Sequence, residues 1–173
     1  MHNKQWAKAA RNPEWRNGIG RLLDDALLSS RVGAGQLSQE MVDFAALVRT
    51  ETDDRRAQGS HVDLSADEAT RGVSVLGDRL ALRRIVANIL DNAIKYGRVA
   101  RLRLQLENPA IVLTVDDEGP GIPPDRRQAM LEPFNRLETS RNRATGGAGL
   151  GLAVARSLVE AHDGTIGLAE APG

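Results

Sequence analysis

The middle of this chain limits its possible folds more than any other part. Asp78 is a good helix N-cap, and the residues after it carry apolar side chains at helical spacing until Gly97 stops the pattern. Two segments of alternating apolar and polar residues follow, 101–106 and 111–116, which suits an antiparallel strand pair with one face in water. The apolar face of the helix comprises Leu82, Ile85, Val86, Ile89, Leu90 and Ala93.

The other predicted elements are short, and they complete an α+β pattern. Residues 1–20 show no clear period, residues 119–149 are rich in loop-forming residues, and Asn108-Pro109 predicts the turn between the two long strands. The remaining predicted elements are helices at 21–32, from Asp43 to about Gly59 and at 150–161, and strands at 62–64, 73–76 and 165–168. This order predicts an α+β fold, a two-layer α/β sandwich with helices on one face of a mixed sheet.

The composition excludes several classes of function. There are no cysteines, which excludes disulfides, thiolate catalysis and Cys-ligated zinc and fits a cytoplasmic location. The formal net charge is zero, so nothing indicates capture of nucleic acid or of an anionic membrane by charge. No apolar run approaches the roughly 20 residues that span a bilayer, and whether a longer parent protein is membrane-anchored stays open.

Three polar residues of the long helix, Asn88, Asn92 and Lys95, fall on one stripe roughly opposite its apolar face. A solvated helix face is the ordinary interpretation of such a stripe. Asn is a poor helix former, however, and two of them stand in mid-helix in register. Amide oxygens and an ammonium group also suit a magnesium polyphosphate, as hard ligands for the ion and a point charge for the phosphates.

Two glycine-containing segments flank the loop-rich stretch. Asp117 ends a predicted strand, and Gly119 and Gly121 follow it. The glycines fit a tight turn. They also fit a binding site in which a flat ring approaches the backbone and the Asp117 carboxylate accepts a hydrogen bond from that ring. Residues 146–152 are glycine-rich and run into the last helix, where free N–H groups and the helix dipole favour phosphate. No Gly-Lys-Ser/Thr follows them, and their place near the C-terminus does not suit a dinucleotide fingerprint.

In this order, these segments resemble the histidine kinase branch of the GHKL ATPase superfamily, over residues 42–170. The matching boxes are the N box at 88–97 (NILDNAIKYG), the G1 box at 117–121 (DEGPG), the F box at 132–136 (EPFNR) and the G2 box at 147–152 (GAGLGL), which continues to 159–166. The resemblance implies a Bergerat-type ATP-binding fold, ATP and Mg²⁺ as cofactors, and the catalytic domain of a two-component sensor histidine kinase.

The resemblance also implies a role for each matching residue. Asn92 would coordinate Mg²⁺, Asn88 would lie beside the phosphates and Lys95 would contact them, and these three would be the catalytic residues. Tyr96 would flank the adenine, and Asp117 would accept a hydrogen bond from its amino group. The other nucleotide-binding residues would be Gly119, Gly121 and Ile122 in the adenine pocket, Phe134 and Arg136 in a lid at about 135–147, and Gly147, Gly149, Leu150, Gly151 and Leu152 at the phosphates.

The acceptor of the phosphate is not evident in this chain. Its histidines are His2, His61 and His162; none lies in a phosphoacceptor sequence, and His162, at the end of the last helix, is predicted to be structural. The implied activity is that of a protein histidine kinase that phosphorylates a histidine supplied by another domain. The implied partners are a dimerisation and phosphoacceptor histidine domain, a response regulator and a second copy of the chain.

The N-terminal region departs from a pure catalytic domain. Residues 21–35 resemble the end of the second dimerisation helix of these kinases. We therefore expect residues 1–36 to be a tail plus a remnant of that helix, and residues 37–173 to be the ATP-binding catalytic domain.

Two other functions stay open from the sequence. GHKL ATPases of the gyrase, mismatch-repair or chaperone type carry Glu at the first N-box position as the general base for water. This chain has Asn88 there, which cannot take a proton. A non-catalytic nucleotide-binding or dimerisation module would keep the fold without the chemistry, and the four intact boxes count against it.

Overall fold

The computed structural model describes residues 13–107, 109–135 and 149–170. It divides into two compact units, Met1–Gln36 and Leu37–Gly173. Every predicted site residue belongs to the second unit. Within the described residues, no helix combines the length and the hydropathy needed to cross a membrane.

The first unit contains the helix α2 (Pro13–Gly33). The helix predicted at 21–32 is confirmed, and so is its end: Gly35 adopts a φ of 63°, and the Gln36 N–H donates to the Arg31 carbonyl at 2.8 Å. Residues 13–20 extend this helix although they show no apolar period. Proline suits the first turn of a helix, and a helix that has nucleated propagates through neighbours of modest propensity.

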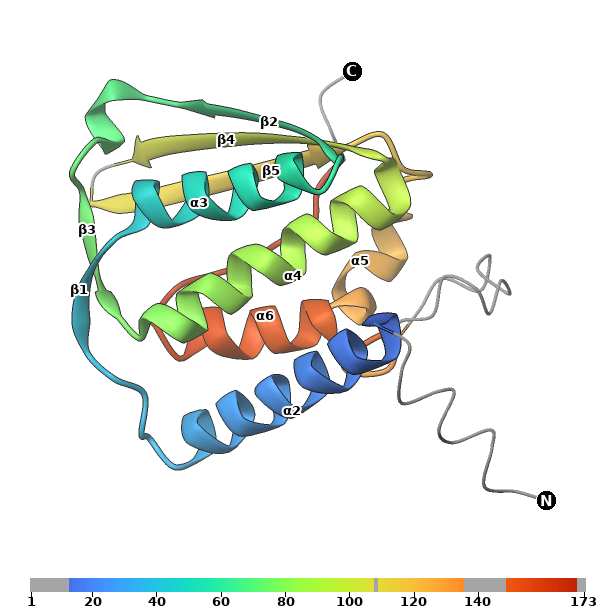
Figure 1. Ribbon diagram of the computed structural model, residues 1–173, viewed down its shortest axis with the longest axis horizontal. Coiled ribbons are helices and arrows are strands. Elements are labelled where there is room, and N and C mark those ends of the chain that lie inside the picture. The colour runs from blue at the N-terminus through green and yellow to red at the C-terminus, as the bar shows by residue number, and fades with distance from the viewer. Residues whose placement is uncertain (1–12, 108, 136–148, 171–173) are drawn as a thin grey trace. The chain divides into compact units, whose positions relative to one another are not determined.

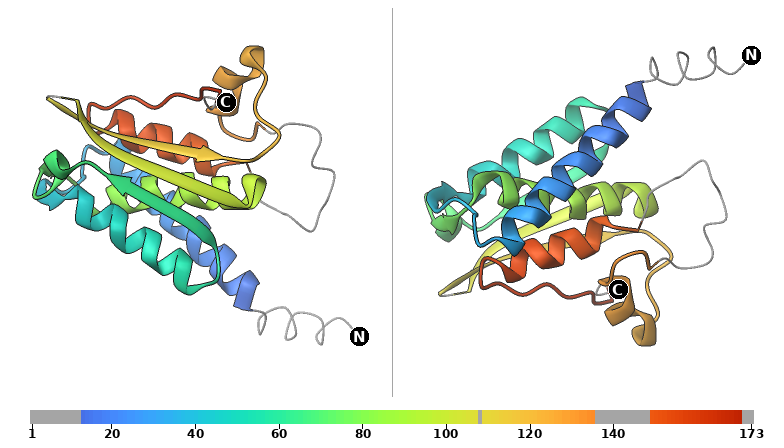
Figure 2. Two further views of the ribbon diagram at one scale, coloured as in Figure 1. Left: turned by 90° about the horizontal axis from the view of Figure 1, so that it is seen from above. Right: turned by 90° about the horizontal axis from the view of Figure 1, so that it is seen from below.

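The second unit has two layers. A three-stranded sheet has the order β2 (His61–Ala66), β4 (Val99–Glu107), β5 (Ala110–Asp117), with β2 parallel and β5 antiparallel to β4. Three helices lie on one face of this sheet: α3 (Phe44–Ala57), α4 (Arg79–Gly97) and α6 (Gly151–Glu160) (Figures 1 and 2). The prediction of an α+β sandwich with a mixed sheet is confirmed. The turn predicted at Asn108-Pro109 lies partly outside the described residues, because Asn108 is not among them.

Three short elements complete the unit and were not predicted as such. The strand β1 (Glu40–Asp43), which was not predicted, pairs antiparallel with β3 (Ser74–Gly77), which confirms the strand predicted at 73–76. This pairing places Met41 opposite Leu76. A 3₁₀ turn covers Glu68–Thr70, and the helix α5 (Pro124–Met130) lies within the stretch predicted to be rich in loops. Elements this short show too few periods to stand out in the sequence.

The helix starts follow the sequence prediction because both are capped locally. The Asp43 carboxylate accepts from the Ala46 N–H at 2.8 Å. The Asp78 carboxylate accepts from the N–H groups of Leu80 and Ala81 at 3.0 and 3.1 Å. It also accepts from Ser38 N–H at 2.9 Å, so this buried side chain ties the entry segment of the unit to the start of α4.

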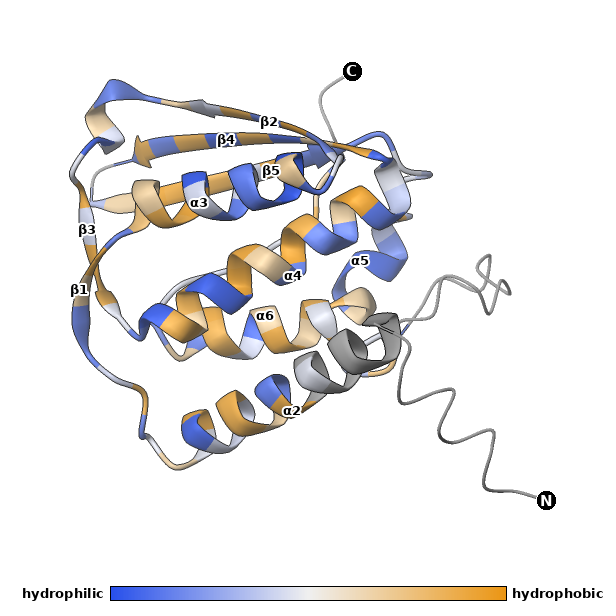
Figure 3. Ribbon diagram, in the orientation of Figure 1, coloured by the Kyte–Doolittle hydropathy of each residue, from blue (hydrophilic) through white to orange (hydrophobic). Residues whose placement is uncertain are grey.

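The core is aliphatic, as the sequence predicts. Its fully buried members include Val42, Val48, Val86, Leu90, Leu104 and Leu158. Along β4, the buried Ala100, Leu102 and Leu104 alternate with the exposed Arg101 and Arg103, and Figure 3 shows this alternation as a change of colour along the strand. The helices therefore cover one face of the sheet, and the arginine side of β4 faces water.

The C-terminal end departs from the prediction in one respect. Residues 165–168 were predicted to form a last strand, and this is wrong, because the structure assigns no strand between Gly164 and Glu170. The segment is short and contains Gly167, which has no side chain to pack against a neighbouring strand.

His162 has a structural position, as predicted. Its Nε2 accepts from the Asp78 N–H at 3.1 Å, so its Nδ1 carries the proton that bonds the Leu158 carbonyl at 2.6 Å. A Cβ atom at Gly77 would lie 2.5 Å from the imidazole ring, so the ring packs on the backbone there. His162 thus joins the end of α6 to the start of α4.

Candidate functional site

The end of α4 packs directly against the end of β5. A Cβ atom at Gly97 would lie 2.5 Å from Asp117 Cβ and 2.7 Å from the Glu118 backbone nitrogen, so only glycine fits there without a shift of the backbone. The sequence indicated Gly97 only as a helix stop, and no local pattern reveals the contact. It places the last turn of α4, with Lys95 and Tyr96, beside the Asp117 carboxylate.

The Asp117 carboxylate is held by the turn that follows it. Its Oδ1 accepts from the Gly119 N–H at 2.7 Å, and a Cβ atom at Gly119 would lie 2.6 Å from the same oxygen. The second carboxylate oxygen has no hydrogen-bond partner among the described residues, and Asp117 is exposed. The structure therefore presents one fixed, free acceptor at the end of the strand.

The loop after Asp117 is supported by a residue that the sequence did not single out. Gly121 adopts a φ of 72°, and the Ile122 carbonyl accepts from Arg127 Nε at 3.0 Å. The Arg127 guanidinium also lies 3.6 Å from the Glu170 carboxylate. Arg127 of α5 thus holds the loop after Asp117 through the Ile122 carbonyl. The sequence could not indicate this role, because nothing in the local pattern distinguishes Arg127 from the other arginine of this short helix.

Asn88 does not lie where the sequence placed it. The stripe of Asn88, Asn92 and Lys95 was expected on the side of α4 away from the core, but Asn88 is only 7% exposed. Its side chain faces α6, because a Cβ atom at Gly151 would lie 3.8 Å from Asn88 Cγ. The expectation was wrong for Asn88 because α6 packs along that side of α4, which a helical period cannot show.

The buried amide of Asn88 lacks a partner. Its Nδ2 is the one buried side-chain nitrogen or oxygen, among the described residues, without a hydrogen-bond partner. Leaving such a group unsatisfied costs about 1–3 kcal/mol. A buried donor without a partner beside the first residue of α6 is suited to an acceptor atom of a ligand.

The rest of the stripe is progressively more exposed. Asn92 is half-buried and Lys95 is exposed. The Lys95 ammonium lies 4.8 Å from the centre of the Tyr96 ring, and that ring is 40% exposed. The side chains thus run from a buried amide to an exposed cation and aromatic ring.

The start of α6 has no side-chain cap among the described residues. Leu150 is its N-cap and makes no side-chain capping bond, so the first N–H groups of the helix find no side-chain acceptor within that part of the chain. Gly149, just before it, adopts a φ of 70°. Leu152 lies in the first turn and is half-buried. Phe134 is 74% exposed at a φ of 64°, and its N–H donates to the Gly149 carbonyl at 3.2 Å. The predicted Arg136 and Gly147, and almost all of the predicted lid, lie outside the described residues.

These groups together suit a nucleotide with its metal. A free carboxylate oxygen at Asp117 can accept from an exocyclic amine, while the start of α6 and Lys95 can meet phosphate. Within the described part of the chain, no cluster of three or more His, Cys, Asp or Glu side chains could hold a metal ion. A magnesium ion here would take the Asn92 oxygen and complete its ligands from phosphate and water.

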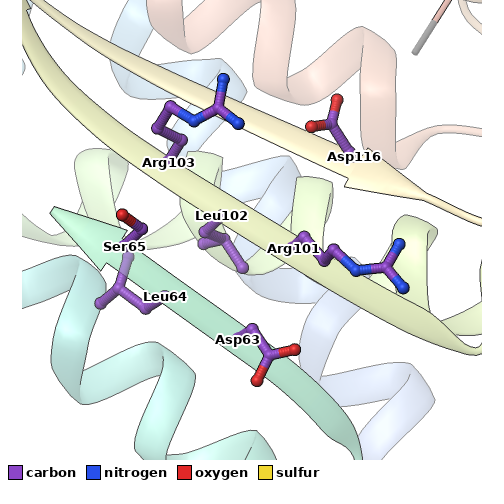
Figure 4. Close-up of a pocket in the computed structure, with 7 residues that line it drawn as sticks. All are labelled: Asp63, Leu64, Ser65, Arg101, Leu102, Arg103 and Asp116. Atoms are coloured by element: carbon purple, nitrogen blue, oxygen red, sulfur yellow. The ribbon is translucent and has the colours of Figure 1, made fainter. Parts of the chain in front are cut away.

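A separate hollow of about 280 Å³ lies on the far face of the sheet (Figure 4). It is lined by Asp63, Leu64, Ser65, Arg101, Leu102, Arg103 and Asp116. In the strand register, Asp63, Arg101 and Asp116 lie side by side across the three strands, so opposite charges alternate in one row. The hollow contains none of the predicted site residues, and its balanced charges suit a solvated sheet face.

Gly97→Ala is expected to weaken nucleotide binding and to lower the free energy of unfolding by about 1–3 kcal/mol, the cost of overpacking. The added methyl group would meet Asp117 and the Glu118 backbone, which cannot rotate away. Thermal unfolding and calorimetric titration with ATP would measure both effects. Gly167→Ala is the matched control, because a Cβ atom there meets nothing within 4 Å. Equal ATP affinity in Gly97→Ala and the unmodified chain would contradict a role for this contact in the site.

Comparison with known proteins identifies one family model, described as histidine kinase-, DNA gyrase B-, and HSP90-like ATPase, which matches residues 77–173. The chain is 36% identical over 159 residues to a probable sensor histidine kinase, TcrY, of Mycobacterium tuberculosis. It is 35% identical over 163 residues to the sensor histidine kinase RppB of Synechocystis sp.. These alignments cover 90% of this chain but only 34% and 36% of the two relatives, so the chain spans about a third of their length.

Solved structures show the same similarity. The mycobacterial sensor histidine kinase MprB superposes with a TM-score of 0.61 at 30% identity, covering 75% of this chain and 83% of that one. Full-length ShkA in complex with AMPPNP superposes with a TM-score of 0.70 at 26% identity, covering 96% of this chain and 35% of that one.

Proposed function

Because the chain belongs to the family of histidine kinase-, DNA gyrase B- and HSP90-like ATPases, we propose that it is the Mg-ATP-binding catalytic domain of a two-component sensor histidine kinase. It transfers the γ-phosphate of ATP to a histidine on a dimerisation and phosphoacceptor domain. The observation that carries the proposal is the orphaned amide of Asn88, buried beside the start of α6. The names of the relatives and the order of the four boxes support the same activity.

The proposed adenine end lies at Asp117. Its free oxygen accepts from the adenine amino group, because the other oxygen is already engaged by the Gly119 N–H. Gly119 and Gly121 leave room for the ring, Ile122 and Tyr96 flank it, and Arg127 keeps the loop in place. A carboxylate in this position favours adenine over guanine, because guanine presents a carbonyl oxygen where adenine presents its amino group.

The proposed phosphate end lies between α4 and α6. The free N–H groups of Gly151 and its neighbours Leu150 and Leu152 donate to phosphate oxygens, as do the Asn88 amide and the Lys95 ammonium. Asn92 supplies an oxygen to Mg²⁺, which when bound neutralises charge on the phosphates. Phosphoryl transfer of this kind depends on positioning and charge neutralisation rather than on a covalent step at the enzyme.

The lid residues belong to the proposal as well. Phe134 and Gly149 flank the predicted lid segment, and the Phe134 N–H donates to the Gly149 carbonyl. We assign Arg136 as a phosphate contact and Gly147 as part of the phosphate-binding turn, on the sequence match alone.

The proposed partners are supported by the relatives, which are named sensor histidine kinases. We propose that α2 corresponds to the end of a dimerisation helix, which supports a homodimer, and that the phosphate passes from the histidine of the phosphoacceptor domain to a response regulator. A domain that consumes ATP in this way would work in the cytoplasm.

Asp117→Asn is expected to weaken ATP binding by about 1.5–3 kcal/mol, the range for hydrogen bonds to charged groups. Asparagine keeps one oxygen for the Gly119 N–H but presents an amide donor toward the adenine amino group. Isothermal titration calorimetry with ATP on both proteins measures the difference.

Glu118→Gln is the control, because Glu118 is the neighbouring carboxylate and pairs with Arg101 on β4. It should bind ATP like the unmodified chain. If Asp117→Asn also binds ATP with unchanged affinity, Asp117 does not belong to the adenine site. If the unmodified chain binds no adenine nucleotide at millimolar concentration, the proposed function itself is wrong.

A further inference from the structure

A charged network joins α3 to the helix that carries the candidate phosphate site. The Glu51 side chain is 2% exposed, and its carboxylate forms two ion pairs. Its Oε2 lies 2.5 Å from a terminal guanidinium nitrogen of Arg55, and its Oε1 lies 2.6 Å from Arg83 Nε. The Arg55 guanidinium continues to α4, where its Nε and one terminal nitrogen donate to Asp91 Oδ1 at 3.2 and 3.1 Å. One arginine of α3 therefore divides its donors between a buried carboxylate and Asp91.

The position of Asp91 connects this network to the candidate phosphate site on α4. Asp91 lies three residues after Asn88 and immediately before Asn92, so it extends the stripe of Asn88, Asn92 and Lys95 at helical spacing. Its carboxylate is about a third exposed. A negative charge at the border of this stripe opposes the binding of a polyphosphate beside it, unless a cation offsets that charge.

The Arg55 guanidinium is suited to offset the charge of Asp91. Arg55 is mostly buried, with 14% of its side chain exposed, so solvent screens the pair less than it screens a surface ion pair. Burial acts to lower the pKa of Arg55, but the charges of Asp91 and Glu51 outweigh it and leave the pKa raised. The fork of Arg55 also holds the Asp91 carboxylate on the α3 side of α4, whereas Asn88 faces α6.

We propose that Arg55 is a positioning residue for nucleotide binding, which holds the Asp91 carboxylate against α3 and offsets its charge beside the phosphate site. This inference rests on the proposed function, because it concerns the same site on α4. It predicts an effect that grows with the number of phosphates on the ligand, which a general loss of stability would not produce.

The test compares three variants of the full chain by calorimetric titration with adenosine, ADP and ATP in the presence of Mg²⁺. Arg55→Gln is expected to lower ATP affinity by about tenfold, the order for one unit charge acting over roughly 10–12 Å at an effective dielectric constant near 20. The loss should be smaller for ADP and absent for adenosine. Arg55→Gln combined with Asp91→Asn should regain most of the ATP affinity, because the charge that Arg55 offsets is then gone.

Arg83→Gln is the matched control, because it also removes one arginine from Glu51 and one positive charge from the chain but does not touch Asp91. It should keep the ATP affinity of the unmodified chain. Its thermal stability should fall less than that of Arg55→Gln, because the Arg83 side chain is 57% exposed and the Arg55 side chain only 14%. The proposal is overturned if Arg83→Gln loses ATP affinity as Arg55→Gln does, if adenosine binding falls with ATP binding, or if the double variant is not rescued. Failure of the unmodified chain to bind ATP would instead overturn the proposed function.

Discussion

Asn92→Ala is expected to abolish Mg²⁺-dependent nucleotide binding and to leave the fold intact. Asn92 is half-buried on α4, and its side chain makes no hydrogen bond to any other described residue. Alanine is the better helix former, so α4 should lose nothing. Loss of even an outer-shell partner of a metal costs about 10–100-fold in affinity, so loss of a direct ligand should exceed that range. Calorimetry with ATP, in Mg²⁺ and in a chelator, measures the effect.

The control for Asn92→Ala is Gln105→Ala, which removes an amide from β4 on the far face of the sheet. Circular dichroism and thermal unfolding should show that both variants fold like the unmodified chain. The outcome that counts against a metal bridge is simple: if the unmodified chain binds ATP equally well with and without Mg²⁺, Asn92 has no ion to hold.

Incubated alone with labelled ATP, the chain is expected to acquire no phosphohistidine and to hydrolyse ATP very slowly. His162 uses both ring nitrogens within the fold, His61 is an exposed residue at the start of β2, and His2 lies outside the described residues. Asn88 cannot serve as a general base, whose help is typically worth about 10²–10⁴ in rate. An intact dimerisation and phosphoacceptor domain added in trans should become labelled, slowly, because no tether raises its effective concentration.

Gel autoradiography with acid and alkali treatment distinguishes phosphohistidine on either protein. Acid-labile label on this chain alone, lost in His61→Gln or His162→Gln, would make the chain a complete kinase and overturn the prediction. A melting curve for His162→Gln is needed beside it, because that change removes the ring that accepts from the Asp78 N–H. Rapid ATP turnover without an acceptor would instead favour an ATPase.

Local signals in the sequence were sufficient for most of the second unit. Asp43 and Asp78 cap their helices through bonds to residues two or three positions away, and the strands of the β4–β5 pair alternate because one face is buried. Such features depend on neighbours in the chain, so they can be read without the fold. The residue types of the candidate site, such as the carboxylate at Asp117 and the glycines before α6, were likewise evident from their order.

Only the tertiary structure decided how these residues meet. Asn88 is buried because α6 packs beside it, and Gly97 is required because Asp117 lies against it. Arg55 of α3 contacts Asp91 of α4 because these two helices are neighbours in the fold. The residues of each pair lie between 20 and 63 positions apart in the chain. Helical and strand periods describe one element at a time, whereas burial and ion pairing depend on which elements pack together. The sequence by itself therefore determined the chemistry available at the site, and the packing of α3, α4, α6 and β5 determined its arrangement.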